Sequence, residues 1–242
     1  MARPLVVFDL DDTLYLERDF ARSGYKAVER VLGDRCLSEG FAELCLDLFD
    51  AGERGRIFDR ALERIRLDPE PLLVAELVKA YRGHRPDIAL APDAERYLAA
   101  RSGGIKGALI TDGPAATQEA KISALGLGNH FGCIVCTGRL GTRFGKPHPR
   151  AFEIVERWAG PIGLPLVYVA DNPRKDFVTP NIRGWATIQI ERPQRVHRHR
   201  AAEPSYQAHA SIESLDELDA CLDAMRDDFR ASPGRLWRET TA

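Results

Sequence analysis

Short apolar runs that alternate with helical patterns constrain the fold of this chain most strongly. Strand-like runs lie at residues 5–8, 105–111, 133–136, 166–170, 185–190 and 210–212. Helical patterns separate many of them, at residues 93–100, 114–125 and 150–158. Strands that alternate with helices indicate a parallel sheet covered on both faces. We therefore predict an α/β fold, a Rossmann-like doubly wound parallel sheet.

Residues 17–83 break this alternation because they contain no convincing strand. Apolar residues recur there at helical spacing in four stripes, which run through residues 20–31, 41–49, 57–65 and 72–81. Glycines and prolines separate several of these stripes. We predict an inserted helical domain at residues 16–86, a core domain formed by residues 1–15 and 87–230, and a loosely ordered tail at 231–242.

The composition excludes several classes of protein. The chain has 242 residues, of which 44% are hydrophobic and 29% are charged, as in ordinary globular proteins. Its 34 basic and 36 acidic residues argue against a dedicated nucleic-acid binder. No apolar run approaches the roughly 18 residues of a membrane span. The run Leu5–Phe8 is too short for a signal-peptide core, so we expect a cytoplasmic protein without a membrane partner.

Two polar features receive ordinary interpretations. Cys133 and Cys136 have the spacing of a metal or redox pair, but no second pair accompanies them. We interpret them as packed strand cysteines. The basic run of residues 192–200 could contact an anion, but the near-neutral chain favours a solvated loop.

An acidic cluster directly follows the first predicted strand. Asp9, Asp11 and Asp12 lie at the carboxyl end of that strand, where α/β proteins bind ligands. Carboxylates this close repel one another, and a cation favours their ionised form. Oxygen ligands of this kind suit Mg²⁺. The ordinary alternative is a solvated acidic turn that caps a helix.

Three more polar segments follow later strands. Thr111, Asp112 and Gly113 offer a hydroxyl and backbone N–H groups at a helix start, which suits a phosphate. Lys146 lies on a proline-flanked turn, and the segment from Asp171 to Asp176 adds carboxylates. Each has an ordinary explanation as a capped turn, a surface lysine or an Asx turn. Together they describe one site with anion donors, a fixed cation and metal-binding acids.

The four motifs, DLDDT, TDG, GKPHP and DNPRKD, resemble in this order those of the haloacid dehalogenase superfamily. The likeness is to its phosphatase-like subfamily I, whose members carry a helical C1-type cap after the first motif. It extends from about Leu5 to Leu222. The resemblance implies that Asp9 is a nucleophile and Asp11 a general acid and base. It also implies that Thr111, with the N–H groups of residues 112 and 113, holds the phosphoryl oxygens, and that Lys146 neutralises charge.

The same resemblance implies a metal site and a source of specificity. Asp9, Asp171 and the main-chain carbonyl of Asp11 would hold Mg²⁺. Asp176 and Thr13 would lie behind these ligands and orient them. The cap would select the leaving group through segments around Phe20 and Arg56. Pro180 would shorten the helix that follows the last motif.

These features predict a Mg²⁺-dependent phosphomonoesterase acting on a small phosphorylated metabolite, with sugar phosphates among the candidates. A phosphosugar mutase shares both motif-one aspartates, so the motifs leave it open. A 2-haloacid dehalogenase needs no metal and lacks the second aspartate, which disfavours it here. A non-catalytic binding or regulatory protein on this fold would not require all five core residues. The sequence leaves a monomer or a dimer open.

Overall fold

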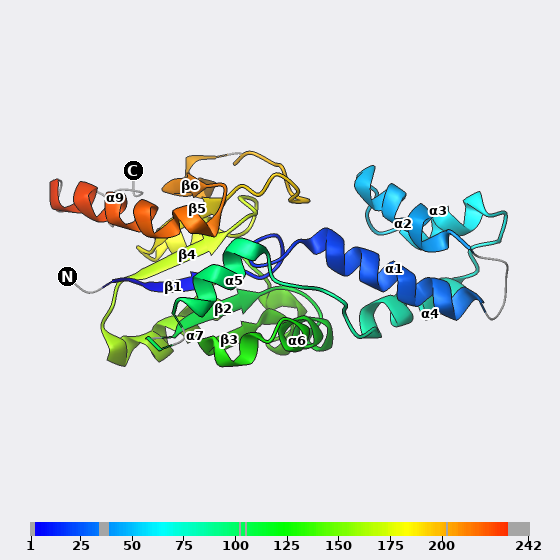
Figure 1. The fold of residues 1–242 in the computed structure, drawn as a ribbon, viewed down its shortest axis with the longest axis horizontal. Coiled ribbons are helices and arrows are strands. Elements are labelled where there is room, and N and C mark those ends of the chain that lie inside the picture. The colour runs from blue at the N-terminus through cyan, green and yellow to red at the C-terminus, as the bar shows by residue number, and fades with distance from the viewer. Residues whose placement is uncertain (1–2, 34–38, 102, 105, 202, 232–242) are drawn as a thin grey trace. The chain divides into compact units, whose positions relative to one another are not determined.

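The computed structural model describes residues 3–33, 39–101, 103–104, 106–201 and 203–231. It divides into two compact units, one formed by Met1–Leu16 and Ala89–Ala242 and the other by Glu17–Ile88. The first, the core unit, carries the sheet, whereas the described part of the second, the helical unit, is built from helices (Figure 1). Residues 232–242 of the predicted tail lie outside the described residues.

The core unit is built on a six-stranded sheet (Figure 1). Its strands are β1 (Leu5–Phe8), β2 (Gly107–Thr111), β3 (Phe131–Cys136), β4 (Leu166–Ala170), β5 (Ala186–Ile190) and β6 (Ala210–Ile212). They lie in the order β3-β2-β1-β4-β5-β6, and every neighbouring pair is parallel. The predicted Rossmann-like α/β fold is confirmed. The strand order reverses between β1 and β4, the place where such sheets bind ligands.

Helices cover both faces of this sheet. They are α5 (Pro92–Ala99), α6 (Ala115–Ala124), α7 (Arg150–Ala159), α8 (Val178–Ile182) and α9 (Leu218–Ala231). Val7 shares a buried cluster with Phe152 of α7. The next residue, Phe8, points to the opposite face and meets Tyr97 of α5, with ring centroids 5.6 Å apart. Helix α8, which contains Pro180, is only five residues long, in agreement with the expected shortening.

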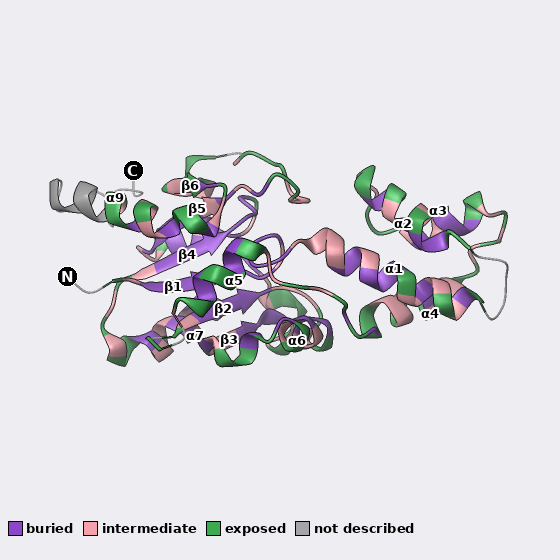
Figure 2. Ribbon diagram, viewed as in Figure 1, coloured by how far each residue is buried: buried purple, intermediate pink, exposed green. Residues whose placement is uncertain are grey.

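The helical unit contains four described helices around an aromatic interior. They are α1 (Glu17–Gly33), α2 (Phe41–Asp50), α3 (Ile57–Arg64) and α4 (Pro71–Gly83). Tyr25 of α1 contacts the rings of Phe49, Phe58 and Tyr81, one from each of the other helices. Figure 2 shows the buried stripes of these helices, but Leu72 is 85% exposed, so its predicted place in the apolar stripe is wrong. No helix among the described residues is both long and apolar enough to cross a membrane.

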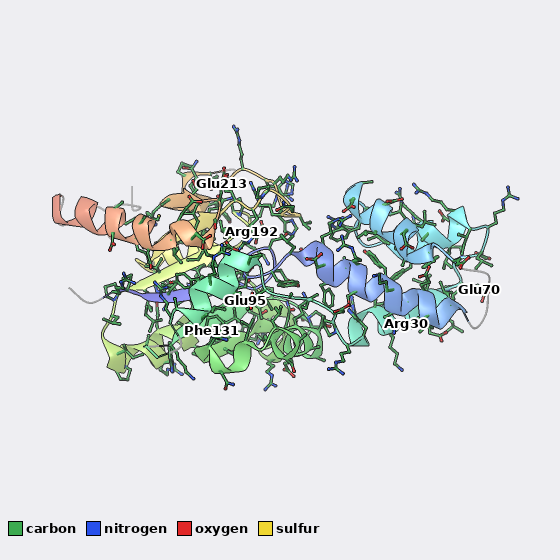
Figure 3. The ribbon with its side chains drawn as sticks, viewed as in Figure 1. Arg30, Glu70, Glu95, Phe131, Arg192 and Glu213 are labelled. Carbon is green, nitrogen blue, oxygen red and sulfur yellow. The ribbon has the colours of Figure 1, made fainter. Side chains whose placement is uncertain are left out.

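We predicted that residues 192–200 form a solvated loop, and this prediction is wrong for Arg192. Arg192 is buried in the core unit (Figure 3), and its guanidinium lies 2.9 Å from Asp93 Oδ1. It also donates to the carbonyl of Thr13, from Nε at 3.1 Å and Nη2 at 2.8 Å. Asp93 Oδ2 accepts from the backbone N–H of Leu215 at 2.7 Å. One buried network therefore joins the loop after β1, the start of α5 and the segment before α9.

Replacing Asp93 by Asn should lower the free energy of unfolding by about 3 kcal/mol at pH 7, because Arg192 would keep its buried charge without a counterion. Burial alone would raise the pKa of Asp93, but its bonds with Arg192 and Leu215 lower that pKa overall. The advantage of wild type over the variant should therefore persist above about pH 4 and shrink as the pH falls through the lowered value. Urea denaturation of both proteins at several pH values measures this difference in the free energy of unfolding.

Asp216→Asn is the matched control because Asp216 pairs with Arg96 at the surface of the same unit. Exposed ion pairs contribute less than about 1 kcal/mol. Equal losses in the two variants would contradict a special role for the buried pair.

Candidate active site

The candidate site lies at the carboxyl ends of the central strands, where the strand order reverses. Asp9 directly follows β1, Asp171 directly follows β4, and Thr111 ends β2. The backbone N–H of Asp9 donates to the carbonyl of Val169 at 2.9 Å, which continues the pairing of β1 with β4. Parallel pairing therefore brings together side chains that are more than 100 residues apart in the sequence.

Lys146 is the buried cation at the centre of this site. Its Nζ lies 2.7 Å from Asp9 Oδ1 and 2.7 Å from Asp176 Oδ1, and it donates to the hydroxyl of Tyr168 at 2.9 Å. Burial would lower the pKa of Lys146, but Asp176 and Asp9 raise it overall, so the ammonium form is held. Burial raises the pKa of Asp9 to about 6 against the opposing effect of Lys146.

Among the described residues, Asp171 is a buried carboxylate that forms no ion pair with a lysine or arginine. Its Oδ2 is buried and has no hydrogen-bond partner among the described residues. Burial and then the charges of Asp176 and Asp9 raise its pKa well above the usual range. Carboxylate oxygens of Asp9, Asp171 and Asp176 lie within 4.8 Å of one another. Such a cluster of hard oxygen donors fits a divalent cation such as Mg²⁺.

The overall charge around the site supports the same conclusion. Its aspartates are Asp9, Asp11, Asp12, Asp112, Asp171 and Asp176, and its lysines are Lys121, Lys146 and Lys175. Each of these lysines is paired with at least one aspartate, and Asp171 is left over. A bound cation would offset this excess of negative charge.

The segment after β2 offers a place for an anion. The Thr111 hydroxyl is fully buried and has no partner among the described residues. A phosphoryl oxygen would supply one. The Asp112 carboxylate is held by Thr137 Oγ1 at 2.8 Å and by the backbone N–H of Lys146 at 3.1 Å. Gly113 has φ +132°, a conformation that a side chain would strain.

Asp11 belongs to the same loop but has its own set of partners. Lys121 Nζ lies 2.6 Å from Oδ1, Gln118 Nε2 donates to Oδ2 at 3.2 Å, and the Tyr15 hydroxyl donates to Oδ1. Burial would raise the pKa of Asp11, but these partners, Lys121 first, lower it overall. The arrangement holds the ionised carboxylate, which is the form that a general base requires.

Thr13, predicted to lie behind the metal ligands, is fully buried in the loop after β1. Its hydroxyl has no hydrogen-bond partner among the described residues, and its carbonyl accepts from Arg192. Asp176 contacts Lys146 and also accepts from the backbone N–H of Asn172 at 3.1 Å. This contact fits the predicted orienting role of Asp176, whereas the role of Thr13 stays a prediction.

Phe20 and Arg56, predicted to contact the substrate, lie in the helical unit. Phe20 is 4% exposed, and its ring packs on Tyr81 and His84 with centroid distances of 5.6 and 4.8 Å. Interior packing therefore accounts for Phe20, and we withdraw it as a substrate contact. Arg56 is exposed, with its guanidinium 3.7 Å from Asp59, and its role stays a prediction.

Four side chains of the site were missed by the sequence reasoning, namely Tyr168, Gln118, Lys121 and Lys175. Tyr168 is an ordinary residue of an apolar strand, so its sequence context carries no signal. Gln118 and Lys121 lie on the buried face of α6 beside Thr117, a phase that the structure shows and the sequence alone does not set. Polar residues on the buried face of a helix indicate partners in the interior.

The fold and this cluster define an α/β protein with an aspartate-rich site at the switch point of its sheet. The family model for haloacid dehalogenase-like hydrolases matches residues 4–178. The chain therefore belongs to the haloacid dehalogenase-like hydrolases.

Curated relatives within this family are phosphatases by name. A glyceraldehyde 3-phosphate phosphatase from Methanopyrus kandleri is 29% identical over 236 residues, which cover 92% of this chain and 97% of that protein. A phosphoserine phosphatase from Thermus thermophilus is 34% identical over 143 residues, covering 59% of this chain and 56% of that protein. Among solved structures, a 2-haloacid dehalogenase from Pseudomonas syringae superposes with a TM-score of 0.61 at 24% identity, covering 93% of this chain and all of that one. The last likeness concerns the fold alone.

Proposed function

We propose that this protein is a Mg²⁺-dependent phosphomonoesterase that acts on a small phosphorylated metabolite. The observation that carries the proposal is the buried Lys146, held between Asp9 and Asp176 beside the unsatisfied oxygens of Thr111 and Asp171. A phosphate would satisfy Thr111 and share Lys146, and a divalent cation would satisfy Asp171. A cytoplasmic location stays a prediction from the sequence.

In the first step, Asp9 attacks phosphorus while the bond from phosphorus to the ester oxygen breaks. The electron pair of that bond goes to the ester oxygen, which takes a proton from Asp11 and leaves as an alcohol. Asp11 must acquire that proton before this step, because its partners favour the ionised form in the free protein. Throughout this step the Lys146 ammonium contacts the phosphoryl oxygens and Asp9. Its positive charge offsets their negative charge, which burial away from water would otherwise disfavour.

In the second step, ionised Asp11 takes a proton from water as that water attacks the aspartyl-phosphate. Inorganic phosphate leaves, and Asp9 returns to its carboxylate form. Asp9, Asp171 and the Asp11 carbonyl would hold Mg²⁺, with Asp176 behind them. The bound cation would supply positive charge beside the transferring phosphoryl group.

Three-carbon phosphates are the first substrates to test. The glyceraldehyde 3-phosphate phosphatase from Methanopyrus kandleri matches nearly the whole chain, whereas the phosphoserine phosphatase matches about half of it. We therefore place glyceraldehyde 3-phosphate ahead of phosphoserine.

The dehalogenase alternative is disfavoured by Asp11, which three side chains hold in place. A mutase would use the same groups and differ in returning a phosphorylated product. A purely binding protein would not need a buried lysine between two aspartates, because well-packed apolar side chains there would often stabilise the fold as well or better.

The test is release of inorganic phosphate from glyceraldehyde 3-phosphate, phosphoserine and p-nitrophenyl phosphate, each with Mg²⁺ and with EDTA. We expect Mg²⁺-dependent turnover of at least one of the two metabolites. Release of chloride from 2-chloropropionate without phosphatase activity would favour a dehalogenase, and a rearranged phosphate ester would favour a mutase.

Arg56→Ala should reduce kcat/KM for the physiological substrate about tenfold or more and leave p-nitrophenyl phosphate nearly unaffected. Arg56 follows a turn in which Gly52 and Gly55 both have positive φ, and its side chain is 63% exposed. An exposed guanidinium can bind a second polar group of a substrate. Arg60→Ala is the control, because Arg60 is an exposed arginine of the adjoining helix α3 and is paired with Glu53. Equal losses on both substrates would remove Arg56 from the specificity residues.

A further inference from the structure

The two carboxylate oxygens of Asp11 have unequal surroundings. Oδ1 accepts from both the Lys121 ammonium, at 2.6 Å, and the Tyr15 hydroxyl. Oδ2 accepts only one described bond, from Gln118 Nε2 at 3.2 Å. Two donors contact Oδ1 and one contacts Oδ2, so Oδ2 is the oxygen with more room for a further partner.

Lys121 and Gln118 belong to α6, and both face inward. The Lys121 side chain is only 7% exposed, and burying an ammonium is unfavourable unless a partner offsets it. Gln118 donates from the same amide nitrogen to the carbonyl of Asp112, in the segment predicted to hold the phosphoryl group. Helix α6 thus contacts the candidate acid through Lys121 and Gln118, and the candidate phosphate loop through Gln118.

We propose that Lys121 is a positioning residue that fixes the Asp11 carboxyl so that Oδ2 delivers its proton to the ester oxygen of the leaving group. This inference rests on the proposed phosphatase function. Tyr15 holds the same oxygen as Lys121, and Gln118 sets the distance between Asp11 and the phosphate loop. Proton transfer requires heavy atoms about 2.6–3.2 Å apart, and a misplacement of about 1 Å can slow a reaction on the order of 100-fold.

The dependence of rate on the leaving group tests this role. A p-nitrophenolate departs with little help from an acid, whereas an alkoxide needs a proton. Lys121→Met should lower kcat/KM about 100-fold for glycerol phosphate, by an intermediate factor for phenyl phosphate, and at most about threefold for p-nitrophenyl phosphate. The parameter kcat/KM excludes the later hydrolysis of the aspartyl-phosphate, in which Asp11 also takes part.

Three variants complete the experiment. Lys121→Arg keeps the charge and should recover much of the loss on glycerol phosphate. Tyr15→Phe removes one bond to Oδ1 and should show the same leaving-group pattern more weakly, which provides a test if Lys121→Met does not fold. Glu119→Gln lies on the same helix and removes only a surface pair with Arg139, so it should behave as wild type.

The possible failures are distinguishable. Equal losses on all three phosphates, or no loss, in a folded variant overturn the role of Lys121 and leave the phosphatase proposal intact. A wild-type protein that releases phosphate from none of the three overturns the proposed function, and with it this inference.

Discussion

Asp9→Asn should lower phosphatase turnover by at least about 10⁴-fold, the scale on which removing a nucleophile acts in other enzymes that form covalent intermediates. The amide is nearly isosteric with the carboxylate but cannot attack phosphorus. Asp9 is buried, and its Oδ1 contacts Lys146 at 2.7 Å, so the variant leaves the cavity and the cation in place. Single-turnover reactions with ³²P-labelled substrate should yield labelled protein from wild type and none from the variant.

The fold should survive this change. Burial raises the pKa of Asp9 to about 6, so the fold disfavours its ionised form, and the stability associated with the protonated carboxyl is lost as the pH rises from about 4 toward 6. Asn does not ionise, and Lys146 keeps Asp176 as a partner at 2.7 Å. The melting temperature of Asp9→Asn at pH 8 should therefore equal or exceed that of wild type.

Asp12→Asn is the matched control in the same loop. Asp12 Oδ2 accepts from the backbone N–H of Val196 at 2.6 Å, a bond that an amide oxygen can replace. Its φ of 51° lies in the left-handed region, which Asn tolerates. Asp12 is itself buried, but Asn keeps its size and its accepting oxygen, so the activity of the variant should stay within about fivefold of wild type. A labelled, active Asp9→Asn protein would exclude Asp9 as the nucleophile.

The sequence predicts the sheet and the central cluster because both depend on local patterns. Apolar runs mark the strands, Asp9 and Asp171 each follow a strand directly, and Thr111 ends one. Once the strands are parallel, their carboxyl ends must meet at one edge, so the meeting of these side chains follows from position in the chain. Lys146 was predictable for a different reason, its place on a proline-flanked turn of a recognisable motif.

The residues that were missed depend on contacts between segments far apart in the chain. Arg192 lies in a basic, polar stretch that is typical of a surface loop, and only the fold brings it to Asp93. The inward direction of Lys121 depends on the phase of α6 relative to the sheet. Phe20 was misassigned because an aromatic residue on a cap helix has the same pattern whether it packs inside the helical unit or contacts a ligand.

Removal of divalent cations should abolish phosphatase activity, and Mg²⁺ but not Ca²⁺ should restore it. Mg²⁺ keeps a tight octahedral geometry, whereas Ca²⁺ accepts more oxygen ligands at longer distances and would engage the Asp9 oxygen that attacks phosphorus. A second readout does not depend on turnover. At a Mg²⁺ concentration about 100 times its Kd, binding to the folded state adds about 2.7 kcal/mol, which corresponds to a rise of about 5 °C or more in melting temperature.

Asp171→Asn should remove both effects of Mg²⁺ and lower turnover by about 10³-fold, the scale of losing a metal ligand together with its charge. Without Mg²⁺, however, this variant should be more stable than wild type at neutral pH. Burial raises the pKa of Asp171 well above the usual range, so an ionised Asp171 destabilises the fold increasingly as the pH rises above about 4. Asp216→Asn, in an exposed pair of the same unit, should keep the full response to Mg²⁺. A melting temperature that still rises with Mg²⁺ in Asp171→Asn would place the cation elsewhere. Lower turnover together with higher stability in the absence of Mg²⁺ is the result expected for a buried carboxylate that binds a metal.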